Sequence, residues 1–365
     1  TAHIRRHDTY HSTFELENGN IFRRTIADPS AIEFLPTAHG EMSVEQIREH
    51  ALATTPETLE WDCFTFGVVQ KPDHFTFYAS VDHLHIDGMS AGVIFLDIHL
   101  MYQDLSQGHA TALPEVVGYR DYTARQQRHI AATTLESPEI ADWISFAQNN
   151  DGNWPAFPLP LGEPELGPER VEVRDVFDVD AGAAFAVQAR NDGVSTLALA
   201  VAVMTAVTRE LADAPLRAVF PVHSRFDTTW HDSVGWFITN SVLESTVAEP
   251  RAAADAVKEA VQLGSWPLAD VLSPWGGMPM SPGMFAISWL DLRRLPVRID
   301  DVGLDAQYVS AAIQTDGVML WSILDESGLH LRCRYPDTRE ARTNVGAWLD
   351  LLVTRLQAQA RTSVR

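Results

Sequence analysis

The sequence of 365 residues is poor in cysteine and in positive charge. Its two cysteines, Cys63 and Cys333, are too few for a disulfide framework, so reduced thiols in a cytosol are the simplest interpretation. Lys and Arg number 27 against 49 Asp and Glu, which gives a formal net charge of -22. This balance excludes nucleic acid as the default partner, because phosphate binding needs a concentrated positive surface. It also argues against binding to an anionic membrane surface.

The sequence also lacks an apolar run long enough to cross a bilayer, for which about 18 residues are needed. The longest candidate, residues 197–207, ends before Arg209 and predicts a buried core helix. Residues 1–7 contain neither an initiator Met nor the apolar core of a signal peptide, so we expect the natural N-terminus to be missing. Apolar residues make up 45% of the chain, which is typical of a globular protein with a sizeable core.

A proline-rich stretch divides the chain. Five prolines between residues 149 and 168 exclude a helix or an interior strand there. We therefore expect an N-terminal part (1–150), a connector (151–170) and a C-terminal part (171–365). Both parts contain strand-like and helical patterns in runs rather than in strict alternation, which predicts an α+β fold with two halves of similar size.

Hydrophobic periodicity and turn residues predict the main elements. Strands are expected at residues 64–70, 74–81, 171–179, 216–222, 236–243, 284–290, 318–324 and 329–335. Helices are expected at residues 88–102, 119–132, 137–148, 196–212, 251–263 and 338–359. The strands at 64–70 and 74–81 should form a hairpin, followed at once by a buried helix.

The segment DHLHIDG lies between that hairpin and that helix. A histidine at such a junction can act as a general base, Asp87 can fix the loop by charged hydrogen bonds, and Gly88 allows close approach of another molecule. Three interpretations stay open at this point: an ordinary polar strand end, a metal site of His83, His85 and Asp87 sharing one face of an extended segment, or an acid–base site. A metal site lacks a second cluster of ligands, and a serine triad lacks the G-x-S-x-G elbow.

The same segment resembles the HHxxxDG motif of the CoA-dependent acyltransferase superfamily, which includes chloramphenicol acetyltransferase and the condensation domains of peptide synthetases. The second His of the motif falls on His83, its Asp on Asp87 and its Gly on Gly88, whereas Asp82 stands in place of the first His. The resemblance implies that His83 is the catalytic base and that Asp87 and Gly88 shape the motif.

A second segment, DSVGWFITN, is similar to the DFGWG-type segment of the superfamily and to the VGxFxN strand of condensation domains. Arg225 stands where condensation domains place the arginine that pairs with the motif aspartate. The resemblance implies a substrate tunnel lined in part by His85, Gly235, Trp236, Phe237 and Asn240. Core packing explains the two aromatic residues equally well.

Further phrases resemble the polyketide-synthase-associated (Pap) acyltransferases of mycobacterial lipid synthesis, in the branch that acylates trehalose or sulfated trehalose. They are residues 4–11 (IRRHDTYH), 61–64 (WDCF), 75–80 (FTFYAS) and 157–162 (FPLPLG). In that family another strand and helix precede the point where this chain begins, so we expect the N-terminal part to lack them. The family fold implies two pseudo-symmetric chloramphenicol-acetyltransferase-like subdomains with the active-site tunnel between them.

The resemblance implies an O-acyltransferase that moves a long-chain acyl group from acyl-CoA or an acyl carrier of a polyketide synthase to a trehalose hydroxyl. No metal and no cofactor are expected, since the CoA or phosphopantetheine thioester is a co-substrate. The expected location is the cytoplasm, either free or at the inner face of the membrane, with peripheral contact to membrane lipid left open. The alternatives are a peptide-synthetase condensation domain and a non-catalytic member that binds a carrier or a lipid.

Overall fold

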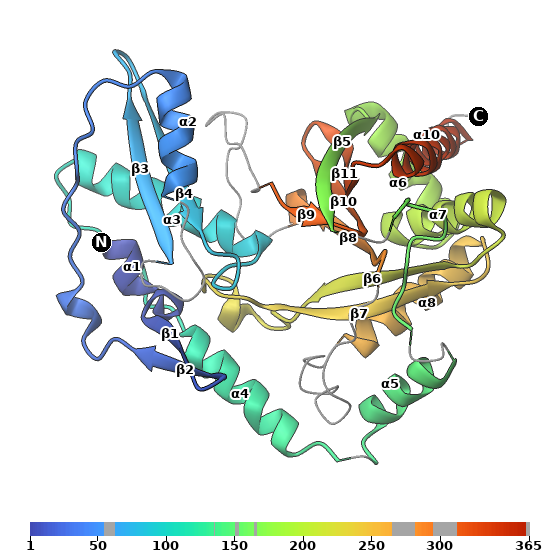
Figure 1. The fold of residues 1–365 in the computed structure, drawn as a ribbon, viewed down its shortest axis with the longest axis horizontal. Coiled ribbons are helices and arrows are strands. Elements are labelled where there is room, and N and C mark those ends of the chain that lie inside the picture. The colour runs from blue at the N-terminus through green and yellow to red at the C-terminus, as the bar shows by residue number, and fades with distance from the viewer. Residues whose placement is uncertain are drawn as a thin grey trace. The chain divides into compact units, whose positions relative to one another are not determined.

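The computed structural model describes residues 1–54, 63–134, 136–149, 153–163, 166–264, 282–294 and 312–362, which divide into two units (Figure 1). The first unit contains Thr1–His129 and Arg225–Phe237, and the other described residues form the second. Helix α5 (Pro138–Asn149) is in the second unit. The domain boundaries at residues 150 and 170 stay predictions. Trp61 and Asp62 of the WDCF phrase and residues 151–152 and 164–165 of the connector lie outside the described residues.

Two antiparallel hairpins form the strands of the first unit. The hairpin of β3 (Phe64–Gln70) and β4 (Phe75–Val81) confirms the sequence prediction. The hairpin of β1 (Ser12–Glu17) and β2 (Asn20–Thr25) was missed. Its turn is Asn-Gly, with both residues in the left-handed region at φ 52° and 81°. This dipeptide is a strong hairpin signal because a tight type I′ turn requires positive φ at both positions.

The described α-helices that begin in the first unit are α1 (Ala2–Arg6), α2 (Val44–Ala53), α3 (Gly88–Ser106) and α4 (Tyr119–Ala131). Two of them, α1 and α3, contribute residues to a small apolar core. The core combines Ile4 and Tyr10 from the N-terminus with Phe64 of β3 and Val93 of α3, and it includes Val234. The late segment Arg225–Phe237 is thus part of the core of the N-terminal unit.

A buried carboxylate on α3 holds the N-terminal residues. Asp97 Oδ2 accepts hydrogen bonds from His3 Nδ1 at 3.0 Å and from His7 Nε2 at 2.8 Å. Arg6 Nη1 donates to both carboxylate oxygens of Asp97, at 2.6 and 2.7 Å. Tyr10 lies against His3, with 3.3 Å between its hydroxyl and His3 Nε2. The phrase at residues 4–11 is therefore bound to the helix that follows the motif loop.

A seven-stranded mixed sheet forms the second unit, in the order β7-β6-β8-β10-β11-β5-β9. Its strands are β5 (Gly167–Phe177), β6 (Leu216–His223), β7 (Ile238–Ser245), β8 (Phe285–Asp291), β9 (Gln314–Thr315), β10 (Val318–Asp325) and β11 (Gly328–Pro336). Strand β8 runs parallel to β6 and β10, and the other pairs are antiparallel. The architecture is α+β, as the sequence predicted.

Helices α6 (Val179–Asn191), α7 (Thr196–Ala212) and α10 (Arg339–Thr362) lie side by side against this sheet, and α8 (Pro250–Leu263) packs on α7 and β7 (Figure 1). The apolar run predicted as a core helix is α7, whose interior is almost fully buried. Within the described ranges, no single helix has the length and apolarity to cross a membrane; α6 and α7 meet those criteria only together, with a 90° bend between them.

Burial of the histidines around Asp97 predicts an acid-sensitive first unit. Burial lowers the pKa of His7 to about 4 and lowers that of His3, against the raising effect of Asp97 in both cases. The unfolded chain therefore binds more protons as the pH falls from 6.5 toward 4, and the free energy of unfolding falls with it. For His7 alone the loss is on the order of 3 kcal/mol.

We expect urea unfolding at pH 7, 6, 5 and 4.5 to show a shallower pH dependence in His7→Gln than in wild type. The exposed His74 of the β3–β4 turn supplies the control, since His74→Gln should keep the wild-type slope. Equal slopes for wild type and His7→Gln would show that the buried histidine is not the source of the acid sensitivity.

Candidate active site

The motif loop spans the six residues between the end of β4 and the start of α3. Its first residue, Asp82, closes a turn: its Oδ1 accepts the Leu84 N–H at 3.0 Å and its carbonyl accepts the His85 N–H at 3.0 Å. Its last residue, Asp87, caps α3 by accepting the Ser90 N–H at 2.7 Å. Aspartate favours both positions because its side chain bonds nearby backbone N–H groups. Asp82, which replaces the first motif His, thus shapes the loop.

The loop gives its two histidines different environments. His83 is exposed, while only 3% of the surface of His85 is accessible. An extended segment would place His83, His85 and Asp87 on one face, but the turn at Asp82 prevents this. The metal interpretation that depended on a shared face therefore loses its geometric basis.

The backbone of the loop fixes the tautomer of His83. Its Nδ1 lies 2.8 Å from the carbonyl oxygen of Ile86. A carbonyl only accepts, so Nδ1 carries the proton and donates it to this bond. In the neutral ring Nε2 then has a free lone pair, and no described residue makes a hydrogen bond to it. His83 is thus an exposed, oriented base.

His85 packs beneath the loop. Its ring lies 5.8 Å from the ring of Phe14 between centroids, and its carbonyl accepts the Thr9 hydroxyl at 3.2 Å. Its Nδ1 is 3.6 Å from Asp82 Oδ1, too long for a hydrogen bond. Neither ring nitrogen has a hydrogen-bond partner among the described residues. Burial lowers the pKa of His85, against the raising effect of Asp82.

Asp87 and Arg225 form a buried ion pair in the first unit. Arg225 Nη2 lies 3.0 and 3.1 Å from the two carboxylate oxygens, and both side chains are at most 3% exposed. Asp87 Oδ2 also accepts the Phe237 N–H at 3.1 Å. The two oxygens of Asp87 therefore bind the start of α3, the guanidinium and a backbone N–H from a distant segment.

The remaining contacts of Arg225 hold its own segment together. Its Nη1 donates to the carbonyl oxygens of Trp230 at 2.5 Å and of Ser233 at 2.7 Å. The guanidinium carbon lies 3.8 Å from the centroid of the Phe237 ring, a favourable cation–π distance. Burial lowers the pKa of Arg225, while Asp87 raises it.

Ser90 is a residue of this network that sequence reasoning missed. It is fully buried, and its hydroxyl donates to the Gly235 carbonyl at 2.9 Å. The same oxygen accepts the Gly235 N–H at 3.1 Å and Arg225 Nη2 at 2.8 Å. One donor and two acceptor positions are thus all used. A serine three residues after a helix-capping aspartate was the available signal, but its partners are 135 and 145 residues away in the chain.

The segment held by Ser90 and Asp87 places Trp236 beside the base. The rings of His83 and Trp236 meet edge to face with 4.9 Å between centroids. The Trp236 carbonyl accepts the Tyr119 hydroxyl at 2.7 Å. A Cβ on Gly235 would lie 2.3 Å from the Tyr119 ring, so this position requires glycine. Phe237 is fully buried, packs on Tyr122 and Trp230 and is therefore a core residue.

Gly88 and Asn240 make none of the hydrogen bonds described above for Asp87, Arg225 and Ser90. The φ of Gly88 is outside the left-handed region, and a Cβ added there would meet no atom within 4 Å. Neither the backbone nor its neighbours therefore require glycine, which leaves open space at the first residue of α3. Asn240 lies in β7 of the second unit, opposite Pro221 of β6.

A second group with metal-ligand spacing lies apart from the motif loop. Among the described residues it consists of His3, His7 and Asp97. The histidine nitrogens that face Asp97 already bond its carboxylate, and Arg6 neutralises that carboxylate with two hydrogen bonds. A cation at this place would have to displace the guanidinium, so the group is explained as a structural ion-pair cluster.

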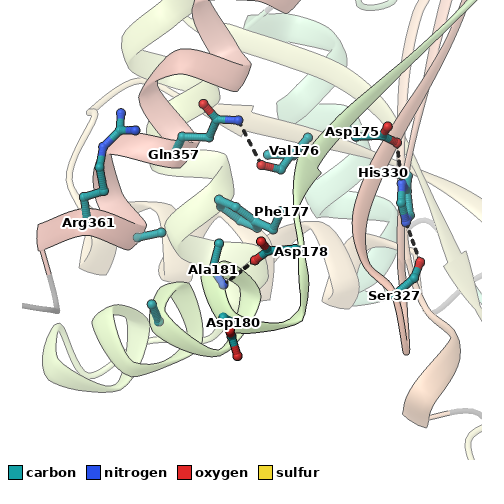
Figure 2. Close-up of a pocket in the computed structure, with 12 residues that line it drawn as sticks. Asp175, Val176, Phe177, Asp178, Asp180, Ala181, Ser327, His330, Gln357 and Arg361 are labelled. Atoms are coloured by element: carbon teal, nitrogen blue, oxygen red, sulfur yellow. Dashed lines mark hydrogen bonds and ion pairs between the residues drawn. The ribbon is translucent and has the colours of Figure 1, made fainter.

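A cavity of about 780 Å³ in the second unit contains a Ser–His–Asp chain (Figure 2). Ser327 Oγ lies 2.8 Å from His330 Nε2, and His330 Nδ1 lies 2.8 Å from Asp175. The Ser327 hydroxyl, however, donates to Asp325 Oδ1 at 2.6 Å, and the Ser327 and Gly328 N–H groups bond the same oxygen. Asp175 is 84% exposed. The arrangement closes a turn and offers neither an activated nucleophile nor a free oxyanion hole.

Comparison with known proteins gives a consistent match over the chain. The family model described as "Condensation domain" matches residues 1–263. "Acyltransferase PapA3" of Mycobacterium tuberculosis is 34% identical over 380 residues, covering 99% of this chain and 79% of that protein. "Trehalose-2-sulfate acyltransferase PapA2" of Mycobacterium bovis is 36% identical over 314 residues, covering 81% of this chain and 66% of that protein.

Solved structures extend the match to the fold. The structure titled "PapA2 acyl transferase" aligns with a TM-score of 0.88 at 32% identity, covering 98% of this chain and 81% of that one. A condensation domain of the enacyloxin polyketide synthase aligns with a TM-score of 0.70 at 18% identity over 98% of this chain and 74% of that one. The second likeness shows a common fold.

The buried ion pair predicts a large loss of stability on removal of one charge. Asp87→Asn keeps the side-chain shape but leaves the Arg225 cation without a counter-charge. We expect the free energy of unfolding to fall by about 3–5 kcal/mol in urea titrations. Asp73→Asn is the matched control, because this carboxylate is exposed in the β3–β4 turn and should change stability by no more than about 0.5 kcal/mol. If both variants changed the free energy of unfolding by similarly small amounts, the pair of Asp87 and Arg225 would not contribute to stability as predicted.

Proposed function

The chain belongs to the condensation-domain family and is an acyltransferase of that family, and from this we propose that it acylates a hydroxyl of trehalose or of a trehalose-based glycolipid. The name of the PapA2 relative, a trehalose-2-sulfate acyltransferase, supports this acceptor. "2'-Acyl-2-O-sulfo-trehalose (hydroxy)phthioceranyltransferase PapA1" of Mycobacterium bovis, 51% identical over 167 residues, also supports it. That match covers 45% of this chain and 32% of the relative. The donor in this proposal is a long-chain acyl thioester.

The observation that carries the proposed mechanism is the Nδ1–H bond of His83 to the Ile86 carbonyl. This bond leaves Nε2 as the basic atom, and the exposure of His83 leaves it accessible to a substrate hydroxyl. General acid–base catalysis by a positioned histidine contributes about 10²–10⁴-fold to a rate. Asp87 and Arg225 act on the position of the loop and of Trp236, and they do not touch the reacting atoms.

The proposed reaction needs one base and no cofactor. Nε2 of His83 removes the hydroxyl proton of the sugar while the oxygen attacks the thioester carbonyl carbon. A carbon–oxygen bond forms, the carbon–sulfur bond breaks, and the electron pair leaves with the sulfur. The protonated His83 then returns the proton to the thiolate. The products are an ester and a free thiol, so atoms and charge balance.

The donor is CoA or the phosphopantetheine arm of a carrier protein, such as that of a polyketide synthase. Both present the same thioester to the base, and both release a thiol. We place the reaction in the cytoplasm or at the inner face of the membrane.

Removal of the His83 imidazole tests the mechanism. Wild-type protein is incubated with palmitoyl-CoA and either trehalose or trehalose 2-sulfate, while thiol release and acylated sugar are measured. His83→Ala should lower kcat/KM by about 10² or more. It should change stability little, because the side chain is exposed and makes one hydrogen bond.

His74→Ala is the control for this experiment, because His74 is another exposed histidine in the same unit with a local hydrogen bond to Asp73. Activity that survives in His83→Ala would refute the base assignment and leave the acyltransfer intact. If wild-type protein transfers no acyl group from either a CoA or a carrier thioester, the non-catalytic interpretation replaces the proposed function.

The open space at Gly88 gives an independent test. If substrate passes this position, the methyl group of Gly88→Ala should lower kcat/KM without lowering the thermal midpoint, since no protein atom is in its way. Gly346→Ala in α10 is the matched control: it is also a helical glycine without neighbours within 4 Å. The control should gain up to about 1 kcal/mol of helix stability and keep full activity. Equal activities of the two variants would exclude Gly88 from the substrate path.

A further inference from the structure

Arg23 on β2 is a cation without an acidic partner among the residues that the structure describes. Its Nε donates to the Ser12 hydroxyl at 2.7 Å, and in the described part of the chain its terminal nitrogens have no hydrogen-bond or ion-pair partner. Its neighbour Arg24 instead pairs with Glu15 and Glu17, at 2.6 and 3.2 Å. The chain carries 49 acidic residues, yet none of those in the described ranges bonds the terminal nitrogens of Arg23. Such a fork matches the oxygens of an anionic group.

The register of the hairpin places Arg23 next to the motif loop. Arg23 lies directly opposite Phe14 in the β1–β2 ladder, so both side chains project from the same face. The Phe14 ring packs on His85, with 5.8 Å between centroids. His85 is buried and always carries at least one N–H, which makes no hydrogen bond among the described residues, although Asp82 Oδ1 lies 3.6 Å from its Nδ1. Phe14 is thus the ladder partner of Arg23 and the ring neighbour of a buried imidazole that makes no hydrogen bond among the described residues.

The nearby charges do not neutralise Arg23. The charge of Asp8 acts on Arg23. The Oδ1 of Asp8, however, accepts the Tyr119 N–H at 2.6 Å, and its Oδ2 accepts the N–H and Nε–H of Arg120 at 3.1 Å. Burial lowers the pKa of Arg23, Asp8 raises it, and the positive charge of Arg120 lowers it. Asp8 is thus already occupied by other donors, while the carboxylate of Asp82 lies 3.6 Å from His85 Nδ1.

The charge of Arg23 also acts on Tyr119, which holds the segment of Trp236. Burial raises the pKa of Tyr119, and the charge of Arg23 is among the influences that lower it. The Tyr119 hydroxyl holds the carbonyl of Trp236, whose ring contacts His83. The geometric connection to the base is through Phe14, which is opposite Arg23 in the ladder and packs on His85, two residues after His83.

We propose that Arg23, with His85 beside it, forms a subsite for a sulfate or phosphate ester group carried by one of the two substrates. The guanidinium supplies the charged donors and the His85 N–H a neutral one. Either the acceptor sugar or the CoA donor can carry such a group. The position of the subsite in the reaction rests on the proposed function, but its ligand chemistry does not.

The test measures binding separately from catalysis. Trehalose, trehalose 2-sulfate and CoA are each titrated calorimetrically into wild type, Arg23→Gln and Arg24→Gln. We expect Arg23→Gln to weaken the binding of one anionic ligand by about 10- to 100-fold, the usual range for a hydrogen bond to a charged group. Binding of trehalose should not change. Arg24→Gln, whose charge is already paired, should match wild type.

Kinetics identify the source of the anionic group. If the sugar carries it, Arg23→Gln raises KM for trehalose 2-sulfate and not for trehalose, with kcat nearly unchanged. If the donor carries it, KM rises for palmitoyl-CoA and not for the palmitoyl thioester of N-acetylcysteamine, which has no phosphate. Arg23→Lys should lie between wild type and Gln, because it keeps the charge and loses the fork. His85→Phe, which keeps the ring packing, should weaken the same ligand to a smaller extent.

The subsite is refuted if wild type binds neither anionic ligand, or if Arg23→Gln leaves both affinities unchanged. It is also refuted if trehalose and its sulfate lose affinity equally, because the arginine would then act on the fold of the hairpin. Wild-type protein that binds trehalose 2-sulfate through Arg23 but transfers no acyl group would refute the proposed function and keep the subsite.

Discussion

The buried pair of Asp87 and Arg225 is the interaction on which the geometry of the site depends. Two charges out of water are costly unless they are paired and hydrogen-bonded. Here the carboxylate bonds the first turn of α3, the guanidinium and the Phe237 N–H, and the guanidinium bonds two further carbonyls. The pair therefore joins a loop, a helix start and a segment 138 residues later. The position of Trp236 beside His83 follows from this junction.

The residues that position the loop are buried, whereas the histidine proposed to transfer the proton is exposed. The charged pair and Ser90 are inside the protein, where a low dielectric strengthens their bonds and fixes their geometry. His83 is outside and depends on one backbone carbonyl three residues away for its tautomer. A base that must take a proton from one substrate and give it to another needs access to both. An exposed imidazole on a rigid loop meets both requirements.

Local patterns predicted the fold better than they predicted the site. The β3–β4 hairpin, α3 and α7 have strong periodicity or caps, and they lie where the sequence placed them. Helix α6 was missed because it is rich in alanine and buries only Phe185 and Ala189, which gives a weak amphipathic pattern. The pairing of Asp87 with Arg225 and the use of Ser90 depend on contacts between distant segments, which periodicity does not report. The resemblance to condensation domains predicted the pairing of Asp87 with Arg225, and nothing in the sequence predicted the role of Ser90.

Periodicity also failed to predict the different environments of His83 and His85, which are only two residues apart. In an extended chain the two histidines would lie on the same face and be equally exposed, but the Asx turn of Asp82 exposes His83 and buries His85.

The net charge of -22 likewise does not predict the charge around a particular site. At physiological ionic strength charges are screened beyond about 8 Å, so an anionic group near β2 responds to the nearby charges, among them Arg23 and Asp82, rather than to the whole surface. An acidic protein can therefore bind an anionic substrate wherever a guanidinium lacks its carboxylate.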